Sequence, residues 1–481
     1  MNKSDLKPAC VFEQFARINT IPRPSKHEEK MISFLEQFGK EHNLETIVDE
    51  TGNVLIRKPA TPGYENHDTI ILQSHMDMVC EKLPECNIDF NNDPIETYID
   101  GEWMRAKGTT LGADDGIGCA MELALLASDD IEHGPIECVF TRDEETGLTG
   151  AEGMKSGFMT GKMLINLDSE DEGQIFVSCA GGRRTQATFH PTYEEVKGMF
   201  YLKIGVNSLT GGHSGDDINK KRANAVKLLA RFLYVQLEKR KIQLGTLNAG
   251  GLHNAIPRDG EMIIAIPFAD KEAVRADFNI FVSEVEEEYH VTEPSINMYM
   301  ESAEPEKVMT TEDSKKIILS LQGVDNGILS MCQDKAIEWL VETSNNLASA
   351  KTQQDGSVLI TLSQRSNVMS ALDNMCATVR AIFQLAGADV ETGEGYPAWK
   401  MNPDSKLTKI VVETYKELYG KEPKVLGIHA GLECGLFAER YPDLDMVSMG
   451  PTLRGVHSPD ERLLIPTVDM VWKHLLAILK K

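Results

Sequence analysis

Residues 68–77, DTIILQSHMD, combine a short apolar run with a histidine and an aspartate directly after it. Two further apolar runs, at residues 135–140 (PIECVF) and 163–167 (MLINL), are bounded by polar residues or glycine, as buried parallel strands are. Residues 116–128 (GIGCAMELALLAS), between the first two runs, are apolar nearly all round and long enough for a buried helix. This order of strand, helix and strand predicts an α/β layer built on a parallel sheet.

The middle of the chain has a different pattern, which starts at about Gly182. Residues 200–206 (FYLKIGV) alternate in polarity, as a half-buried strand does. A long helix is expected next, with one apolar face made by Ile218, Ala225, Leu229, Leu233 and Leu237. The order of strand and helix recurs at residues 262–289 and again at 358–383. This pattern predicts an α+β domain with helices on one side, and it leaves open an internal duplication.

From about Gly395 the chain returns to the first pattern. A helix is expected around residues 406–418, then a strand at 445–449 (DMVSM), then a final helix. The simplest architecture is a discontinuous α/β domain formed by residues 1–182 and 395–481, with a mostly parallel twisted sheet between helices. Residues 183–394 would form an inserted α+β domain. A chain of 481 residues is long enough for two or three domains.

The composition excludes several classes of function. Asp and Glu outnumber Lys and Arg by 74 to 49, which gives a formal net charge of −25. This charge argues against nucleic acid or an anionic membrane as partner, because both require clustered positive charge. We expect no signal peptide and no membrane span, since no apolar run has the necessary length. The nine cysteines are odd in number and never spaced as Cys-x-x-Cys, so we expect reduced thiols in a cytoplasmic protein.

Residues of the types that bind metals follow the predicted strands of the first domain. They are His75 and Asp77, the pair Asp114 and Asp115 ahead of the helix, the pair Glu144 and Glu145, then Asp168 and His457. Each has an ordinary explanation when taken alone; an aspartate pair before a helix, for example, is usually an N-cap. Open α/β sheets, however, place their sites beyond the carboxyl ends of the strands. Two histidines with three or more carboxylates there predict a two-metal site, with one carboxylate bridging ions roughly 3.5–4 Å apart.

The motifs around these residues resemble those of a known family. They are His75-x-Asp77, Gly112-Ala113-Asp114-Asp115-Gly116, Asp143-Glu144-Glu145-Thr146-Gly147, Asn166-Leu167-Asp168 and Gly455-Val456-His457. They are similar to motifs of the aminoacyl-histidine dipeptidases (peptidase D, Xaa-His dipeptidase), within the co-catalytic zinc exopeptidase and deacylase family. Motif order and chain length match over essentially the whole sequence. The resemblance implies a discontinuous catalytic domain, an inserted lid domain, and hydrolysis of dipeptides by metal-activated water.

The resemblance also implies two ligand sets. One ion would be held by His75, Asp114 and Asp168, and the other by Asp114, Glu145 and His457. Related sequences often carry Asn after the bridging aspartate, whereas Asp115 stands here, so Asp114 and Asp115 are both candidates for the bridge. The two divalent ions would be zinc, with manganese or cobalt as alternatives, because mixed histidine and carboxylate sites select weakly among metals.

Two further carboxylates have roles beside the metals. One acid must stay free of the ions to take the proton of the water and pass it to the leaving amine. Glu144, next to Glu145, is the candidate for this general base. Asp77, two residues after His75, can reach the back of the imidazole and fix its tautomer.

The remaining candidates would contact the substrate. By resemblance, His213 in the segment GGHSG (211–215) is a catalytic residue that donates to the carbonyl oxygen of the scissile bond. Asn254 and Arg365 resemble residues that bind the substrate carboxylate, and a guanidinium can bind both of its oxygens at once. His429 and Glu433 lie in the glycine-rich segment 427–435, and glycine permits a backbone to approach a ligand closely.

The leading interpretation is therefore a cytosolic two-metal dipeptidase that acts on small peptides. A tripeptidase or an N-acyl-amino-acid deacylase with the same metal residues is an alternative, and so is a non-catalytic metal-binding or peptide-binding protein. The presence of Glu144 argues against the last, because a binding protein has no need of a free proton acceptor. No Gly-x-Ser-x-Gly motif of a serine hydrolase occurs. A homodimer and an internal imitation of such pairing within the inserted domain both remain open.

Overall fold

The structure is a computed structural model that describes residues 6–335 and 337–481. It divides into two compact units. The first unit contains the chain up to Ser178, Trp399–Gly427 and Leu432–Lys481, and the second contains Cys179–Ala398 and Ile428–Gly431. These divisions lie four residues from the expected boundaries at 182/183 and 394/395. The assignment of catalytic and lid roles to the two parts stays a prediction.

One short segment is grouped differently from the expectation. Ile428–Gly431 belongs to the second unit, whereas the sequence pattern placed it with the first domain. The backbone explains the difference, because the N–H of Ala180 lies 3.1 Å from the carbonyl oxygen of Ile428 and 3.0 Å from that of Ala430. These hydrogen bonds hold the segment against the start of the second unit.

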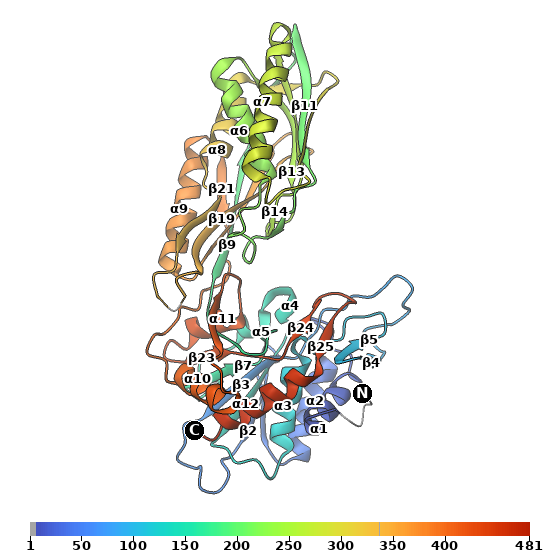
Figure 1. The fold of residues 1–481 in the computed structure, drawn as a ribbon, viewed down its shortest axis with the longest axis vertical. Helices are drawn as coiled ribbons and strands as arrows, with labels where there is room; N and C mark the ends of the chain where they lie inside the picture. Colours follow the sequence, from blue (N-terminus) through green and yellow to red (C-terminus); the bar gives the residue numbers. More distant parts are fainter. Residues whose placement is uncertain (1–5, 336) are drawn as a thin grey trace. The chain divides into compact units, whose positions relative to one another are not determined.

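The first unit is built on a mixed sheet with a parallel centre (Figure 1). Its strand order is β1 (Glu45–Val48), β2 (Val54–Lys58), β6 (Ile136–Thr141), β3 (Ile70–His75), β7 (Met163–Asn166), β23 (Asp445–Ser448), β8 (Gln174–Cys179) and β22 (Lys424–Ile428). β3 runs parallel to β6 and β7, and β7 runs parallel to β23. The pairs β1–β2, β2–β6 and β8–β23 are antiparallel. The predicted strands and the α/β class are therefore confirmed, but the sheet is mixed, with β6, β3, β7 and β23 pairing in parallel.

Five helices share one apolar core with the strands: α1 (Ala9–Ile18), α2 (Glu29–Glu41), α3 (Ala113–Ala127), α10 (Lys406–Tyr419) and α12 (Ile465–Ile478). The unit also contains the shorter helices α4 (Glu144–Gly147), α5 (Thr149–Gly153) and α11 (Glu433–Arg440). The helix expected at residues 116–128 is α3, which is buried along nearly its whole length. A smaller antiparallel sheet contains, in this order, β24 (Leu453–Arg454), β25 (Arg462–Leu464), β5 (Trp103–Ala106) and β4 (Thr97–Asp100).

The second unit contains a long antiparallel sheet with a layer of helices (Figure 1). Its order is β16 (Asn297–Ser302), β11 (Met199–Asn207), β15 (Gly260–Pro267), β13 (Gln243–Gly250), β19 (Val341–Thr352), β20 (Val358–Ser366), β9 (Gly181–Phe189) and β21 (Asp389–Thr392), with β18 (Gly327–Met331) on β19. The helices are α6 (Ala225–Lys239), α7 (Lys271–Tyr289), α8 (Thr311–Gly323) and α9 (Met369–Leu385). Short strand pairs join β10 (Tyr193–Glu194) to β17 (Val308–Met309) and β12 (Gly212–His213) to β14 (Ala255–Ile256).

Alternation along the strands explains why the helices cover one face of this sheet. Leu202, Ile204 and Val206 of β11 share a core with the helices, whereas Tyr201, directly before them, belongs to a smaller cluster. The helix expected to begin near Ile218 begins at Ala225. Asn224 caps it by accepting the N–H groups of the second and third helical residues on its side-chain oxygen.

The two halves of the second unit have the same topology. β11, α6, β13, β15, α7 and β16 occur in this order along the chain. β9, α8, β19, β20, α9 and β21 form a second set in the same order, with the first set inserted between β9 and α8. In each half the fourth strand lies outermost, followed inward by the first, third and second. This correspondence supports the internal duplication, which stays a prediction. None of the helices in the described part of the chain combines the length and apolar character of a membrane span.

Candidate functional site

The parallel strands of the first unit bring the predicted ligands to one edge of the sheet. His75 is the last residue of β3, Glu145 lies in α4 shortly after β6, and Asp168 follows β7 by two residues. Parallel strands end at a common edge, so these three side chains come from neighbouring strand ends. Asp114 lies at the start of α3, and His457 lies in the loop between β24 and β25.

Asp114 lies between the two imidazoles. Its Oδ1 is 3.1 Å from Nε2 of His75, and its Oδ2 is 3.2 Å from Nε2 of His457. Asp168 Oδ1 lies 3.4 Å from Nε2 of His75, and Glu145 Oε2 lies 3.0 Å from Nε2 of His457. The side chains therefore form two groups that share one carboxylate, which is the arrangement that a two-metal site requires.

Asp115 points elsewhere. Its Oδ1 accepts the backbone N–H of Gly118 at 3.2 Å, within the first turns of α3. Of the two adjacent aspartates, the structure thus brings Asp114, and not Asp115, between the imidazoles of His75 and His457.

The electrostatics of this cluster favour positive charge. Hydrogen bonds to Asp114 and Glu145 raise the pKa of His457 to about 11. Burial lowers the pKa of His75, but the nearby carboxylates outweigh it and hold that pKa well above its usual value. Burial also raises the pKa of Asp168, because a charged carboxylate is poorly solvated there. Groups that bind protons so strongly are suited to bind divalent cations in their place.

One buried oxygen supports the same conclusion. Among the described residues, Oε1 of Glu145 has no hydrogen-bond partner although it is buried. A buried carboxylate oxygen without a donor is costly unless a cation neutralises it. The donor set of two imidazoles and three carboxylates is also one that zinc, manganese and cobalt accept. The residues present therefore fit a pair of divalent ions.

Asp77 joins the metal residues to the segment that carries Glu144. Its Oδ1 lies 3.3 Å from Nδ1 of His75, behind the imidazole. Its carboxylate also accepts the backbone N–H groups of Glu144 at 3.1 Å and Glu145 at 3.3 Å, and the hydroxyl of Ser25 at 2.8 Å. Burial raises the pKa of Asp77, but the hydrogen bonds, first of all that with His75, outweigh it and lower the pKa below its usual value.

A second group of acids lies behind this loop. Glu28, Asp77 and Asp143 are buried together, close enough in principle to bind an ion. Their oxygens are instead engaged by donors of the protein: Glu28 accepts the N–H of Asp143 at 3.1 Å and pairs with Arg142 at 2.8 Å, and Asp143 accepts the hydroxyl of Thr149 at 2.6 Å. This group holds the loop of the proposed base in place. The sequence interpretation missed Glu28, because no local pattern links it to a partner 115 positions away.

Glu433 lies inside the first unit, at the start of α11. Its Oε2 accepts the side-chain amide of Gln73 at 2.6 Å and the hydroxyl of Thr141 at 2.9 Å. These partners belong to β3 and β6, so the carboxylate packs against the strands that carry the site. Burial raises the pKa of Glu433 to about 7.

Several predicted substrate residues lie together in the second unit. Nη1 of Arg365, from β20, donates to the hydroxyl of Tyr396 at 2.7 Å, and Nη2 lies 3.3 Å from Nε2 of His213. The other ring nitrogen of His213, Nδ1, lies 3.3 Å from Oδ2 of Asp216. The sequence interpretation did not single out Tyr396 or Asp216, since neither belongs to a motif with a recognisable spacing.

The last two candidates have different surroundings. Nε2 of His429 lies 2.7 Å from the hydroxyl of Ser344, and burial lowers the pKa of His429 to about 3. His429 is thus a neutral buried imidazole within the second unit. The side chain of Asn254, by contrast, is exposed, and its backbone carbonyl accepts the N–H of Ser214 at 2.8 Å.

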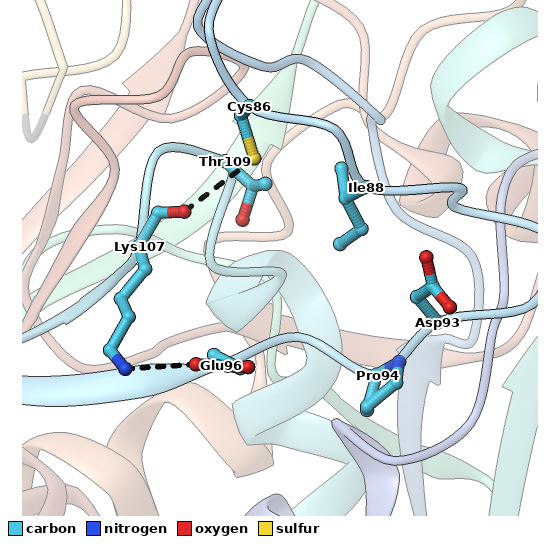
Figure 2. A pocket seen from close by; sticks show the side chains of 7 residues that line it. All are labelled: Cys86, Ile88, Asp93, Pro94, Glu96, Lys107 and Thr109. Carbon is cyan, nitrogen blue, oxygen red and sulfur yellow. Dashed lines mark hydrogen bonds and ion pairs between the residues drawn. The ribbon is translucent and has the colours of Figure 1, made fainter.

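A cavity of about 370 Å³ also lies in the first unit, and Figure 2 shows its lining. Its walls are Cys86, Ile88, Asp93, Pro94, Glu96, Lys107 and Thr109. The amine of Lys107 pairs with Glu96 at 2.8 Å. None of these lining residues belongs to the cluster of His75, Asp114, Glu145, Asp168 and His457, and we assign no chemistry to this cavity.

Comparison with known proteins identifies the family. Residues 71–481 match the model of Peptidase family M20/M25/M40. The chain is 39% identical over 480 residues to the cytosol non-specific dipeptidase of Escherichia coli, covering 99% of this chain and 98% of that protein. It is 40% identical, with a TM-score of 0.94, to the structure of aminoacylhistidine dipeptidase from Vibrio alginolyticus, covering 100% of this chain and 98% of that one.

A more distant structure shares the fold. Aminopeptidase PepT from Bacillus cereus has a TM-score of 0.61 at 17% identity, covering 99% of this chain and 98% of that one. The resemblance to aminoacyl-histidine dipeptidases expected from the motifs is confirmed by the nearer matches. This chain therefore belongs to Peptidase family M20/M25/M40.

Proposed function

We propose that this chain is a metal-dependent dipeptidase in which water attacks the peptide bond and Glu144 acts as general base. The observation that carries the proposal is the position of Asp114, whose two oxygens face the imidazoles of His75 and His457 at 3.1 and 3.2 Å. Membership of a peptidase family and full-length similarity to two dipeptidases support it.

The metal ligands follow from the two groups of side chains. His75, Asp114 and Asp168 would hold one ion, and Asp114, Glu145 and His457 would hold the other. When bound, the pair of ions lowers the pKa of water and polarises the scissile carbonyl group. We assign zinc to the site, with manganese and cobalt as the alternatives that the same ligands accept.

Two other residues of the first unit have different roles: one orients a ligand and one transfers protons. Asp77 keeps the His75 imidazole in the tautomer that leaves Nε2 free to bind. Glu144 takes a proton from the attacking water and passes it to the leaving amine. Burial raises the pKa of Glu144, which makes it a stronger base than an exposed glutamate.

Residues of the second unit are assigned to the substrate. His213 donates a hydrogen bond to the carbonyl oxygen as negative charge develops on it. Arg365 and Asn254 bind the terminal carboxylate, with His429 as a further residue of the pocket. Glu433, in the first unit, is also assigned to the substrate, with its carboxylate between Gln73 and Thr141.

The preferred substrate class is dipeptides with C-terminal histidine. The name of the Vibrio alginolyticus relative supports this preference, whereas the name of the Escherichia coli relative indicates a broader range of dipeptides. The latter name also supports a cytoplasmic location. A homodimer is part of the proposal and is tested by sedimentation of the purified chain.

The experiment combines metal removal with a substrate panel. The chelated protein is assayed before and after addition of Zn²⁺, Mn²⁺ or Co²⁺ on dipeptides with and without C-terminal histidine, on tripeptides and on N-acetyl amino acids. We expect hydrolysis of dipeptides only in the metal-loaded protein. Full activity at nil metal content would overturn the mechanism. Preference for tripeptides or N-acetyl amino acids would instead favour the alternative enzymes, and metal binding without hydrolysis would indicate a binding protein.

A further inference from the structure

Two buried side chains of opposite charge contact the segment that carries Asp114. Glu461 approaches it from the loop that also carries His457, and Arg23 approaches it from the segment after α1. Glu461 is 2% exposed and Arg23 is 1% exposed. Charged groups are rarely buried so completely unless they are bound by polar partners, and here the partners lie in the backbone of the proposed metal site.

The carboxylate of Glu461 binds four consecutive backbone N–H groups. Oε2 accepts those of Leu111 at 2.7 Å and Gly112 at 3.0 Å. Oε1 accepts those of Ala113 at 2.8 Å and Asp114 at 3.3 Å. Glu461 follows His457 by four residues, so this one carboxylate ties the segment of one proposed ligand to the segment of the bridging ligand.

Arg23 links the same Asp114 segment to the residues that follow His75. Its Nη1 donates to the backbone carbonyl of Asp77 at 2.6 Å and to that of Met76 at 3.2 Å. Its Nη2 donates to the carbonyl of Gly112. Met76 and Asp77 directly follow His75, so the guanidinium joins the end of β3 to the segment of Asp114. Gly112 is therefore bound through its backbone N–H by Glu461 and through its backbone carbonyl by Arg23.

The two glycines that flank the aspartate pair make room for this arginine. A Cβ atom on Gly112 would lie 2.6 Å from Nη2 of Arg23, and one on Gly116 would lie 2.5 Å from the same nitrogen. Both distances are well below van der Waals contact. Gly112 in addition has a φ of +66°, which disfavours other residues. Gly116 lies in α3 with no such requirement, so the space for Arg23 is the reason for glycine there.

We propose that Arg23 and Glu461 are positioning residues that hold His75, Asp114 and His457 at the spacing for metal binding. The inference rests on the proposed metal centre. The two buried charges fix the backbone next to each ligand, so the site is already arranged before an ion binds. Their loss weakens metal binding itself.

The experiment measures metal affinity in Glu461→Gln and Arg23→Met by competition with a chromophoric chelator, using Zn²⁺ and Mn²⁺ as probes. We expect roughly 10- to 100-fold weaker binding, the range typical when groups supporting a ligand are removed. Arg23→Lys, which keeps the charge but has a single donor nitrogen, should recover only part of the loss.

Glu137 and Arg57 provide a matched control, because Glu137 lies at the start of β6, opposite to the end that Glu144 and Glu145 follow. Glu137 is 2% exposed and accepts the backbone N–H groups of Thr160 at 2.7 Å and Gly161 at 3.0 Å, and Arg57 pairs with it at 3.0 Å. Glu137→Gln and Arg57→Met remove a comparable buried carboxylate and its arginine. They should lower the melting temperature while leaving metal affinity within about twofold of the wild type, since additive effects are expected at separate sites.

A second variant keeps the test decisive if the first ones fail to fold. Gly116→Ala adds a helix-favouring residue, yet its methyl group must displace Arg23. It should weaken metal binding in the wild-type background and add no further loss in an Arg23→Ala background.

Wild-type affinity in Gly116→Ala, or in the folded Arg23 and Glu461 variants, overturns the positioning role. Equal weakening in the Glu137 and Arg57 controls also overturns it, because the effect would then be one of general stability. If the wild-type protein itself binds neither probe ion, the proposed function fails, which is a distinct result.

Discussion

The carboxylate of Asp77 accepts the backbone N–H of Glu144 at 3.1 Å. The same carboxylate lies 3.3 Å from Nδ1 of His75. One side chain therefore fixes both a proposed metal ligand and the proposed general base, although 67 positions separate Asp77 from Glu144. A change at Asp77 should affect metal binding and proton transfer together.

Asp77→Asn tests this coupling. The amide nitrogen of asparagine cannot accept a hydrogen bond, so either the imidazole or the loop backbone loses a partner. We expect metal affinity to fall roughly 10- to 100-fold and kcat to fall with it, as measured by chelator competition and steady-state kinetics. Asp49→Asn is the matched control, because Asp49 likewise accepts backbone N–H groups, those of Thr51 at 2.9 Å and Gly52 at 2.8 Å. Unchanged metal affinity in Asp77→Asn would contradict the role assigned to it.

Glu144→Gln should separate catalysis from metal binding. The substitution keeps the shape of the side chain but removes the base, so two metals should remain bound while kcat falls roughly 10²–10⁴-fold. Glu145→Gln should weaken one metal as well as turnover. Metal stoichiometry and kcat are measured on both variants, with the exposed Glu152→Gln as control. Loss of a metal in Glu144→Gln but not in Glu145→Gln would show that the two roles are interchanged.

His213→Ala should lower kcat by about 10²–10³ if the imidazole donates to the developing oxyanion. Metal content should stay at the wild-type value, since His213 is not among the proposed ligands. His190→Ala, at an exposed histidine of the same unit, should leave kcat unaltered. An unaltered kcat in His213→Ala would remove this residue from the mechanism.

His474 should make stability depend on pH. Its imidazole is 2% exposed and Nε2 lies 2.9 Å from the carbonyl oxygen of Val411, while burial lowers its pKa to about 4. The unfolded chain therefore binds a proton at higher pH than the folded one, so stability is lost as pH falls from about 6.5 to 4. Protonation of His474 alone should lower the free energy of unfolding by about 3 kcal/mol over that pH range.

His474→Gln keeps a donor for Val411 but does not titrate. The free energy of unfolding of the first unit, measured between pH 7.5 and 4, should fall less steeply in this variant than in the wild type. His67→Gln, at a partly buried histidine of the same unit, should retain the wild-type slope. Identical slopes in His474→Gln and the wild type would show that His474 does not carry the effect.

Local patterns were sufficient to predict four strands of the first unit, β3, β6, β7 and β23, and the residue types that follow three of them. The apolar run before His75 and the buried helix after Asp114 reflect burial on both faces, which local sequence records directly. Histidine and carboxylates at several strand ends then indicate metal chemistry, because parallel strands end at one edge whatever their separation in the chain. The motifs alone likewise carried the family resemblance that the comparisons confirm.

Tertiary structure decided which groups meet across long separations. The choice between Asp114 and Asp115 depends on side-chain direction at the start of α3, which composition does not encode. Glu461 binds the Asp114 segment over a separation of 347 positions, and Arg23 reaches Gly112 over 89. A buried charge bound only by backbone groups leaves no motif, because any sequence can supply N–H and carbonyl partners. Only the folded chain brings those partners to the charge.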